Sequence, residues 1–323
     1  TGTGATHERS ALSFQPDMLW GKSRSNAYNH LLIDSVRGVT KGIFPDLTNA
    51  ETTNVNWLTS FDSDGYTLGP LANWNGSGST YVMWAWKANG SGVSNTDGSI
   101  TSTVSANTTS GFSILTWTGN GTADSTLGHG LESAPEMMIV KERSGANGWA
   151  VYHKKLGSGK EVYLNYTQAE TSSNFWRSTP TTTTFAVSSS NYVNENGTDY
   201  VGYVFHSVDG FSKIGHYTGN GSADGTFVYT GFRPSFVMIK RTDSSDGGGA
   251  GWFMYDSTRD TDNVLYNYVR AESSAAEVTS LEMLDLLSNG FKLRRSGGAV
   301  NGSGGTYIYM AFAENPFKYS NAR

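Results

Sequence analysis

Three aromatic-rich stretches decide the fold: Tyr81-Val82-Met83-Trp84-Ala85-Trp86, Tyr200-Val201-Gly202-Tyr203-Val204-Phe205 and Tyr307-Ile308-Tyr309-Met310-Ala311-Phe312. Each is a short apolar run of the composition that suits a pleated, half-buried strand. Each begins six residues after an asparagine, at Asn75, Asn194 and Asn301. One pattern therefore occurs three times, and internal repetition is the first property to explain.

A second landmark lies upstream of each stretch. A proline (Pro16, Pro135, Pro234) precedes an apolar run that reaches a lysine six positions later, at Lys22, Lys141 and Lys240. An Ala-Glu pair follows the proline by 34, 34 and 37 residues and places Glu51, Glu170 and Glu272 at matching positions. An inserted turn at residues 244–249 explains the extra length of the third copy. We predict that these six charged residues have structural roles that recur with the repeat.

The repetition predicts an all-β fold of three tandem β-sandwich modules, of jelly-roll or concanavalin-like type. Repeat 1 covers residues 1–90, repeat 2 residues 112–210, and repeat 3 residues 211–323 with a C-terminal tail. Residues 91–111 form a connector rich in Gly, Ser and Thr, and its alternation from Ile100 to Val104 is compatible with an extra hairpin.

Local signals agree with strands. Asp64-Gly65, Asp209-Gly210 and Asn289-Gly290 are turn dipeptides typical of hairpins. The only stretch with helical character is 271–287. Repeats 2 and 3 open with Trp117-Thr118-Gly119 and Tyr217-Thr218-Gly219, and Thr1-Gly2 fits the same place without the aromatic residue. We therefore expect the chain to begin inside a module of a longer or processed polypeptide.

Composition excludes several classes of function. A net charge of −5 and a pI near 5.7 provide no basic field for nucleic acid. The chain has no cysteine, so disulfides and thiolate metal sites are absent. The longest apolar runs are too short to span a bilayer, and we expect no membrane insertion.

The repeated glutamates have two interpretations. Glycosidases use two carboxylates that flank a sugar bond. An active site normally occurs once, however, so Glu51, Glu170 and Glu272 are predicted to be structural. We expect each of them to pair, directly or through a nearby backbone group, with a Lys or Arg of the Lys22, Lys141 and Lys240 strands.

Metal binding is not expected, and neither is any cofactor. Asp62-Ser63-Asp64-Gly65 resembles the start of a calcium loop, but the twelfth position of that frame is Asn73, so a turn is favoured. The six histidines lack the spacing of zinc ligands, although His206 and His216 could face each other across a hairpin.

Aromatic residues are the candidates for ligand binding. Trp57, Trp74 and Trp176 occur in polar, loop-like surroundings and have no counterpart in the other repeats. Rings exposed in this way can stack on sugars. We predict that these three tryptophans bind a ligand, whereas the tryptophans in the repeated strands pack in the core.

Several phrases of the sequence point to a family: Phe14-Gln15-Pro16-Asp17, Lys22-Ser23-Arg24, Asp34-Ser35-Val36-Arg37-Gly38 and Ala313-Glu314-Asn315-Pro316-Phe317. They resemble repeat modules of phage tail-fibre and related virion proteins of the marine-phage type. The resemblance covers nearly the whole chain and implies a role in the virion, with no catalytic residues to carry over. Repeat 2 departs from it, because it has His153-Lys154-Lys155 where the other repeats have an Asp and an Arg.

Together these observations predict a non-enzymatic protein of a virion appendage, either a tail fibre or a surface fibre. Its expected partners are host-surface glycan, neighbouring virion proteins and copies of itself. A capsid or tail decorating protein is the first alternative. A polysaccharide depolymerase is the second, and two carboxylates facing each other across a cleft would reveal it.

Overall fold

The computed structural model describes residues 1–10, 12–246, 249–281 and 283–315, and almost all of their regular structure is β-strand. The one helix among these residues, α1 (Ala72–Asn75), has four residues. The all-β prediction is confirmed. The C-terminal tail from residue 316 and positions 247–248 of the inserted turn lie outside the described residues.

Repeat 1 contains three small antiparallel sheets, with the strand orders β3-β2-β8, β1-β7-β6 and β4-β5. Their strands are β1 (His7–Arg9), β2 (Met18–Ser23), β3 (Leu31–Asp34), β4 (Lys41–Gly42), β5 (Thr52–Thr53), β6 (Leu58–Asp62), β7 (Gly65–Leu68) and β8 (Tyr81–Trp86).

Repeat 2 and the connector share a seven-stranded antiparallel sheet of order β15-β14-β13-β17-β11-β10-β9, and β12 pairs with β16. The strands are β9 (Val93–Asn95), β10 (Ser102–Asn107), β11 (Phe112–Thr118), β12 (Ser125–Gly128), β13 (Met137–Glu142), β14 (Ala150–His153), β15 (Val162–Tyr163), β16 (Thr184–Val187) and β17 (Asp199–Phe205). The connector therefore contributes a hairpin, β9-β10, to the edge of this sheet.

Repeat 3 has a five-stranded sheet of order β18-β25-β20-β21-β22 and a three-stranded sheet of order β19-β24-β23. Its strands are β18 (Ser212–Thr218), β19 (Phe227–Tyr229), β20 (Pro234–Arg241), β21 (Trp252–Asp256), β22 (Val269–Arg270), β23 (Leu284–Leu287), β24 (Gly290–Leu293) and β25 (Thr306–Ala313).

The turn dipeptides have different outcomes. Asp64-Gly65 joins β6 to β7, and Asn289-Gly290 joins β23 to β24, as hairpins. Asp209-Gly210 lies in a tight turn between Val208 and Ser212, which form an isolated antiparallel bridge. The turn does not make a hairpin of β17 and β18, which belong to different sheets, so His206 and His216 are not cross-strand neighbours. The described residues of 271–287 are not helical, because its last four residues pair with β24 as strand β23.

The same strand pairing occurs in all three repeats. The proline-led strand pairs with the closing aromatic strand in one register, which aligns Met18 with Trp86, Met137 with Phe205, and Phe236 with Phe312. The asparagine before each closing strand is also used alike: Asn75, Asn194 and Asn301 are fully buried and bind main-chain groups near the start of their own repeat.

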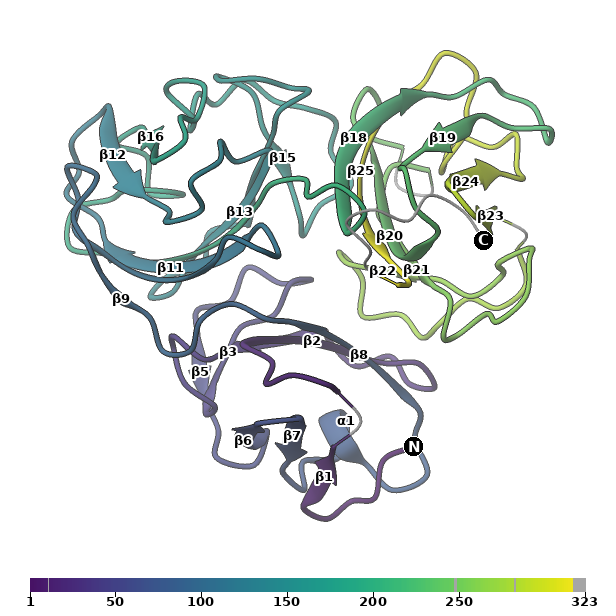
Figure 1. The fold of residues 1–323 in the computed structure, drawn as a ribbon, viewed down its shortest axis with the longest axis horizontal. Helices are drawn as coiled ribbons and strands as arrows, with labels where there is room; N and C mark the ends of the chain where they lie inside the picture. The colour runs from purple at the N-terminus through teal and green to yellow at the C-terminus, as the bar shows by residue number, and fades with distance from the viewer. Residues whose placement is uncertain (11, 247–248, 282, 316–323) are drawn as a thin grey trace.

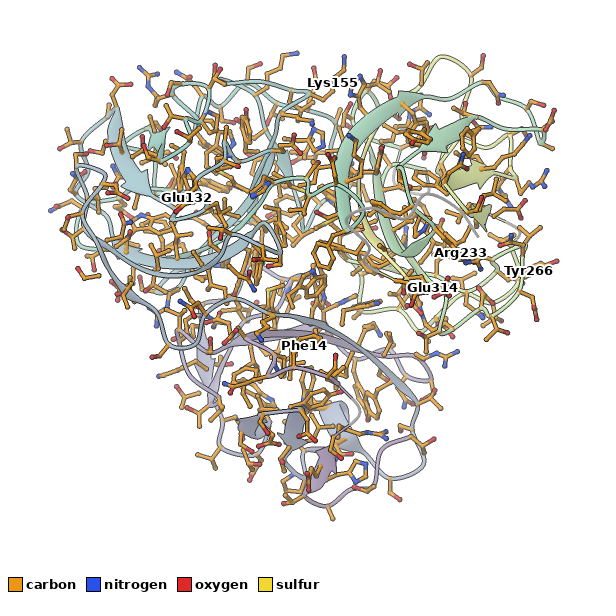
Figure 2. All side chains as sticks on the ribbon, in the orientation of Figure 1. Phe14, Glu132, Lys155, Arg233, Tyr266 and Glu314 are labelled. Atoms are coloured by element: carbon orange, nitrogen blue, oxygen red, sulfur yellow. The ribbon has the colours of Figure 1, made fainter. Side chains whose placement is uncertain are left out.

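The three repeats surround a common centre (Figure 1). A single apolar cluster receives side chains from all of them, including Trp20, Trp86, Phe205, Phe236 and Met310. Figure 2 shows side chains filling the space where the three lobes meet. Further clusters lie mainly within repeat 2, within repeat 3 and within repeat 1. The repeats are therefore parts of one assembly with a shared core.

Equivalent hydrogen bonds close this assembly into a ring. The indole Nε1 of Trp149 in repeat 2 donates to the carbonyl oxygen of Phe44 in repeat 1 (3.0 Å), and Nε1 of Trp252 in repeat 3 donates to that of Tyr163 in repeat 2 (2.8 Å). His30, at the corresponding position of repeat 1, completes the cycle, with its Nε2 3.0 Å from the carbonyl oxygen of Arg270 in repeat 3. Repeats 1 and 3 are thus in contact although they are farthest apart in sequence.

The neutral ring of His30 supplies an N–H donor in the place of the indole N–H. Its Nδ1 accepts a hydrogen bond from the indole of Trp20 (2.9 Å), so the proton is on Nε2, facing the carbonyl oxygen. Burial lowers the pKa of His30 to about 3. The ring contact therefore does not require a charged imidazole.

Candidate functional site

The repeated acidic residues lie where neighbouring repeats meet. Glu51 accepts hydrogen bonds from Arg37 of its own repeat (3.0 Å) and from Nε and Nη2 of Arg143 in repeat 2 (both 3.0 Å). Its backbone N–H donates to the carbonyl oxygen of Arg143 (2.8 Å). Burial alone would raise the pKa of Glu51, but the two arginines outweigh this effect and lower it. Glu51 therefore stays ionised and joins repeat 1 to repeat 2.

Repeat 3 makes the same contact with repeat 1 through Glu277. Its backbone N–H donates to the carbonyl oxygen of Arg24 (2.9 Å), and its carboxylate binds Arg24 (2.8 Å) and Arg259 (2.9 Å). Arg259 also binds Asp256 (2.6 Å), as Arg37 binds Asp34 (2.6 Å) in repeat 1. The Asp-x-x-Arg motif thus forms equivalent buried carboxylate–guanidinium clusters in repeats 1 and 3.

The assignment of Glu272 as the counterpart of Glu51 is wrong. Its carboxylate accepts a hydrogen bond from the backbone N–H of Trp252 (2.8 Å), a role that Asp46 and Asn165 have toward His30 and Trp149. Repeat 3 is longer in two loops: Trp252 follows its proline by 18 residues whereas Trp149 follows by 14, and the loop from β21 to β22 is also extended. Counting along the chain therefore selected the wrong glutamate.

Glu170 has the same backbone contact but a weaker side-chain environment. Its N–H donates to the carbonyl oxygen of Thr242 in repeat 3 (2.7 Å), which completes the cycle of three. Its carboxylate, however, pairs with Lys160, and both side chains are well exposed. Repeat 2 has Leu156 and His153 in place of the buried Arg and Asp. The interface between repeats 2 and 3 therefore lacks the buried carboxylate–guanidinium cluster.

Lys22, Lys141 and Lys240 do not pair with these glutamates. All three are buried, and each ammonium group donates to two main-chain carbonyl oxygens, for example Lys22 to Ser23 (2.6 Å) and Asn26 (3.2 Å). Burial lowers the pKa of each lysine to about 8. The expected pairing of each glutamate with a Lys or Arg of these strands is met by Glu51, which binds Arg143 directly after the Lys141 strand. It is not met through the three lysines, whose ammonium groups donate to main-chain carbonyl oxygens instead.

These contacts predict different costs for two matched substitutions. Glu51→Gln removes a charge between two arginines and is expected to lower the free energy of unfolding by about 1–3 kcal/mol. Glu170→Gln affects an exposed pair and is expected to cost less than about 1 kcal/mol. Urea denaturation of both variants measures the difference. Equal costs would contradict the assignment of Glu51 to a buried interface.

The three predicted ligand-binding tryptophans are buried. Trp57, Trp74 and Trp176 are 5%, 2% and 1% exposed. Trp57 and Trp74 pack in the cluster of repeat 1, and Trp176 in that of repeat 2. Their ring faces are covered by protein, so the expectation that they are free to stack on a sugar is wrong. Polar neighbours in sequence did not indicate exposure, because the side chains turn inward.

Other aromatic side chains are exposed instead. Phe227 and Tyr229 on β19 are 44% and 59% exposed, whereas Val228 between them is buried. Within the described part of the chain, β19 is an edge strand whose one strand partner is β24. Gly290 lies opposite Tyr229, and a Cβ there would clash with the carbonyl oxygen of Val228 and also meet the Phe227 ring at 3.1 Å. The alternation Phe-Val-Tyr is the signal by which sequence reasoning could have found this surface.

Charged side chains lie beside Phe227 and Tyr229. Lys292 lies directly opposite Phe227 on β24 and binds Asp224 (2.5 Å). On the same sheet Arg294 binds Asp285 (2.5 Å). We call Phe227, Tyr229, Lys292 and Asp224 the β19 surface. Aromatic faces beside exposed charges are suited to binding a sugar or a polar peptide.

Comparison with known proteins gives one result. Residues 1–316 match the model of a family described as a domain of unknown function, DUF7483. The chain belongs to the DUF7483 family. No curated protein and no solved structure matches it.

The DUF7483 match spans all three repeats. This extent agrees with the shared core and the cyclic contacts, which make the three repeats one unit. The boundaries at residues 90, 112 and 210 stay predictions. Within the part of the DUF7483 chain that the structure describes, no three His, Asp or Glu side chains are grouped to hold a metal ion, and no helix has the length and apolarity to cross a membrane.

Proposed function

We propose that this protein is a non-enzymatic component of a virion appendage, a tail fibre or surface fibre, which attaches to host-surface glycan or to neighbouring virion proteins. The location proposed is the extracellular particle. The resemblance of Phe14-Gln15-Pro16-Asp17 and the other quoted phrases to virion repeat modules supports the setting.

One observation carries the proposal. Glu51 and Glu277 bind an arginine of another repeat through their carboxylates, and Glu170 contacts the next repeat through its backbone N–H. The aromatic pair of the β19 surface, in contrast, projects from an edge strand. A scaffold of this kind suits presentation of a binding surface better than chemistry on a substrate.

The finer fold is proposed as three tandem β-sandwich modules closed into a ring. The sheet pairs of repeats 2 and 3 and the apolar clusters of those repeats support it. Closing the three repeats into a ring makes the assembly rigid, because the repeats cannot bend about a flexible linker while their shared core is intact.

The alternative function is a capsid or tail decorating protein, and one observation favours it. β19 is an exposed edge strand with aromatic side chains, a surface that another subunit can also cover. Partners would then be other virion proteins and copies of this chain. The size of the covered area discriminates, because a stable subunit interface buries more than about 1,000 Å².

The test measures binding of the protein to an array of bacterial surface polysaccharides. Adsorption of the protein to cells that display the bound polysaccharides is then measured. We expect the double variant Phe227→Ala/Tyr229→Ala to bind at least about tenfold more weakly than the parent protein. Its free energy of unfolding is expected to change by less than about 1 kcal/mol, because both side chains are exposed.

Tyr266→Ala is the matched control. Tyr266 is 38% exposed and lies at the outer rim of repeat 3 (Figure 2). It is far from β19 in sequence, and its neighbour Leu265 pairs with β23, at the opposite edge of the sheet from β19. Its substitution is expected to leave glycan binding unchanged. Binding to no polysaccharide, with the β19 surface instead covered in an assembled particle, would favour the decorating role and reject glycan attachment.

A further inference from the structure

Strand β19 is one of three edge strands that correspond to one another. The small sheets of repeats 1 and 3 have the orders β1-β7-β6 and β19-β24-β23, and in repeat 2 β12 pairs with β16. β1, β12 and β19 thus have the same place in their repeats, and each lies at the end of its sheet. Edge strands expose main-chain groups to other strands, and folded proteins protect such edges. The three edges can therefore be compared directly.

Repeats 1 and 2 protect this edge in different ways. β1 carries two exposed charged side chains, Glu8 and Arg9, which are unfavourable for pairing with another strand. The edge of β12 is covered by the connector, where the N–H of Ile100 donates to the carbonyl oxygen of Thr126 (3.0 Å). Neither form of protection is present at β19. This strand carries no charged side chain and, among the residues that the structure describes, has no strand on its outer edge.

Hydrogen bonds to β24 and its turn fix which main-chain groups of β19 point outward. The N–H of Thr230 donates to the carbonyl oxygen of Asn289 (3.0 Å), and that of Leu293 donates to the carbonyl oxygen of Thr226 (3.0 Å). Because alternate residues of a strand bond to the same neighbour, Val228 also bonds to β24. The residues on either side of Val228 therefore direct their N–H and C=O groups to the free edge. The side chain of Val228 is buried in the core of repeat 3, which holds this edge in place.

The free edge of β19 is complementary to itself. When two copies of the strand pair in antiparallel fashion about a twofold axis at Val228, Phe227 of each copy lies opposite Tyr229 of the other. The outward N–H groups of both copies then donate to the outward carbonyl oxygens, so that no group at the edge is left over. Each Phe–Tyr pair adds an aromatic cross-strand contact. A twofold interface of this kind needs no surface other than β19.

Charge and position also suit a second copy. Lys292, opposite Phe227 on β24, pairs with Asp224 (2.5 Å), so the two charges beside the strand neutralise each other. Two copies therefore bring no net charge together at this edge, although the chain has a net charge of −5. Figure 1 shows the small sheet of β19, β24 and β23 on the outer side of repeat 3, away from the centre where the repeats meet. A second copy can approach it without displacing another repeat.

We propose that β19 is a self-association surface, whose free edge pairs with β19 of a second copy of this chain. The pairing joins the small sheets of two molecules into one continuous antiparallel sheet. It uses main-chain groups in the plane of the sheet and leaves the rings of Phe227 and Tyr229 on one face, next to those of the second copy. Self-association thus goes beyond the proposed attachment and does not depend on it, because the aromatic faces stay accessible to a glycan.

The test is sedimentation velocity of the full chain, without glycan. Because the strand is short, we expect a weak dimer whose fraction rises with concentration between about 1 and 300 µM. Tyr229→Pro removes an outward N–H and keeps the bonds to β24, since an edge strand tolerates proline where the N–H faces solvent. This variant is expected to raise the Kd of the dimer at least about tenfold, because each copy loses one hydrogen bond of the interface.

Glu8→Pro is the matched control. Glu8 precedes Arg9, which lies opposite Tyr66 in β7 as Val228 lies opposite Phe291 in β24. The control therefore makes the same change at an outward position of β1, the corresponding strand of repeat 1. It is expected to leave the Kd of the dimer unchanged, because β1 has no part in the interface.

A second variant tests the interface without proline. Phe227→Lys combined with Tyr229→Lys places lysines opposite lysines in the paired strands, and like charges in this position oppose pairing. We expect this variant to stay monomeric over the whole concentration range at low salt. Both side chains are exposed, so the circular dichroism spectrum is expected to match that of the parent protein.

A parent protein that is monomeric at every concentration would overturn the proposal. A dimer that neither β19 variant weakens would also overturn it, as would one that Glu8→Pro weakens as much as Tyr229→Pro does. Failure of self-association is distinguishable from failure of the proposed function, because sedimentation is measured without polysaccharide. A dimer that binds no polysaccharide would reject glycan attachment and leave the β19 pairing standing.

Discussion

Trp252→Ala is expected to lower the free energy of unfolding by about 3–5 kcal/mol, among the largest effects of any single substitution in this chain. The indole is 1% exposed, lies in the core shared by the three repeats and donates to the carbonyl oxygen of Tyr163. Its removal creates a cavity at the contact between repeats 2 and 3 and leaves a carbonyl oxygen without its donor. Chemical denaturation followed by circular dichroism measures the loss.

Two comparisons separate the causes. Trp252→Phe keeps most of the apolar volume and removes the N–H, so it is expected to cost about 1–2 kcal/mol. Because the three repeats share one core, Trp252→Ala is expected to unfold in a single transition at lower denaturant concentration. Two transitions, with repeats 1 and 2 as stable as before, would contradict the closed ring.

Arg37→Leu is expected to cost about 3–5 kcal/mol, because it leaves the buried Asp34 without its cation and removes one of the two arginines that bind Glu51. The guanidinium binds Asp34 (2.6 Å) and Glu51 (3.0 Å), and it also donates to the hydroxyl of Tyr203 in repeat 2 (3.2 Å). The side chains of Arg37 and Asp34 are fully buried. Thermal and urea denaturation of the purified variant measure the effect.

Repeat 2 suggests a second variant, because it has neither the Asp nor the Arg at the positions equivalent to Asp34 and Arg37. Asp34→Asn combined with Arg37→Leu removes the carboxylate that Arg37→Leu leaves without its cation and is expected to regain part of the loss. Lys154→Met breaks an exposed pair with Glu136 and is the control, with an expected cost below about 1 kcal/mol. If Arg37→Leu is as mild as this control, the buried cluster is not a determinant of stability.

Much of the fold follows from local sequence. The aromatic strands, the proline-led strands and the turns at Asp64-Gly65 and Asn289-Gly290 were predictable, because strand preference and turn geometry depend on neighbouring residues. The spacing from Pro16 to Lys22 is the same as the proline-to-lysine spacing of the other two copies. It also indicated that the proline-led strands pair with the closing strands in a common register. These features require no knowledge of what packs against what.

The site was less predictable, and the errors have specific causes. Glu272 was chosen by its spacing, although two loops of repeat 3 are extended and the contact belongs to Glu277. Trp57, Trp74 and Trp176 were expected at the surface because their sequence neighbours are polar, yet all three are buried. Local sequence does not separate Phe227 and Tyr229 from core aromatics, because an edge strand resembles any other strand in a sequence.

The sequence by itself determined that this chain is all-β and threefold repetitive, since strand alternation and turn residues act within a few positions. Only the tertiary structure decided that repeat 3 returns to repeat 1, that Glu51 and Arg143 meet, and which aromatic rings face solvent. The physical reason is that burial and ion pairing arise between residues distant in sequence. Their partners are fixed only when the three sheets pack around one core.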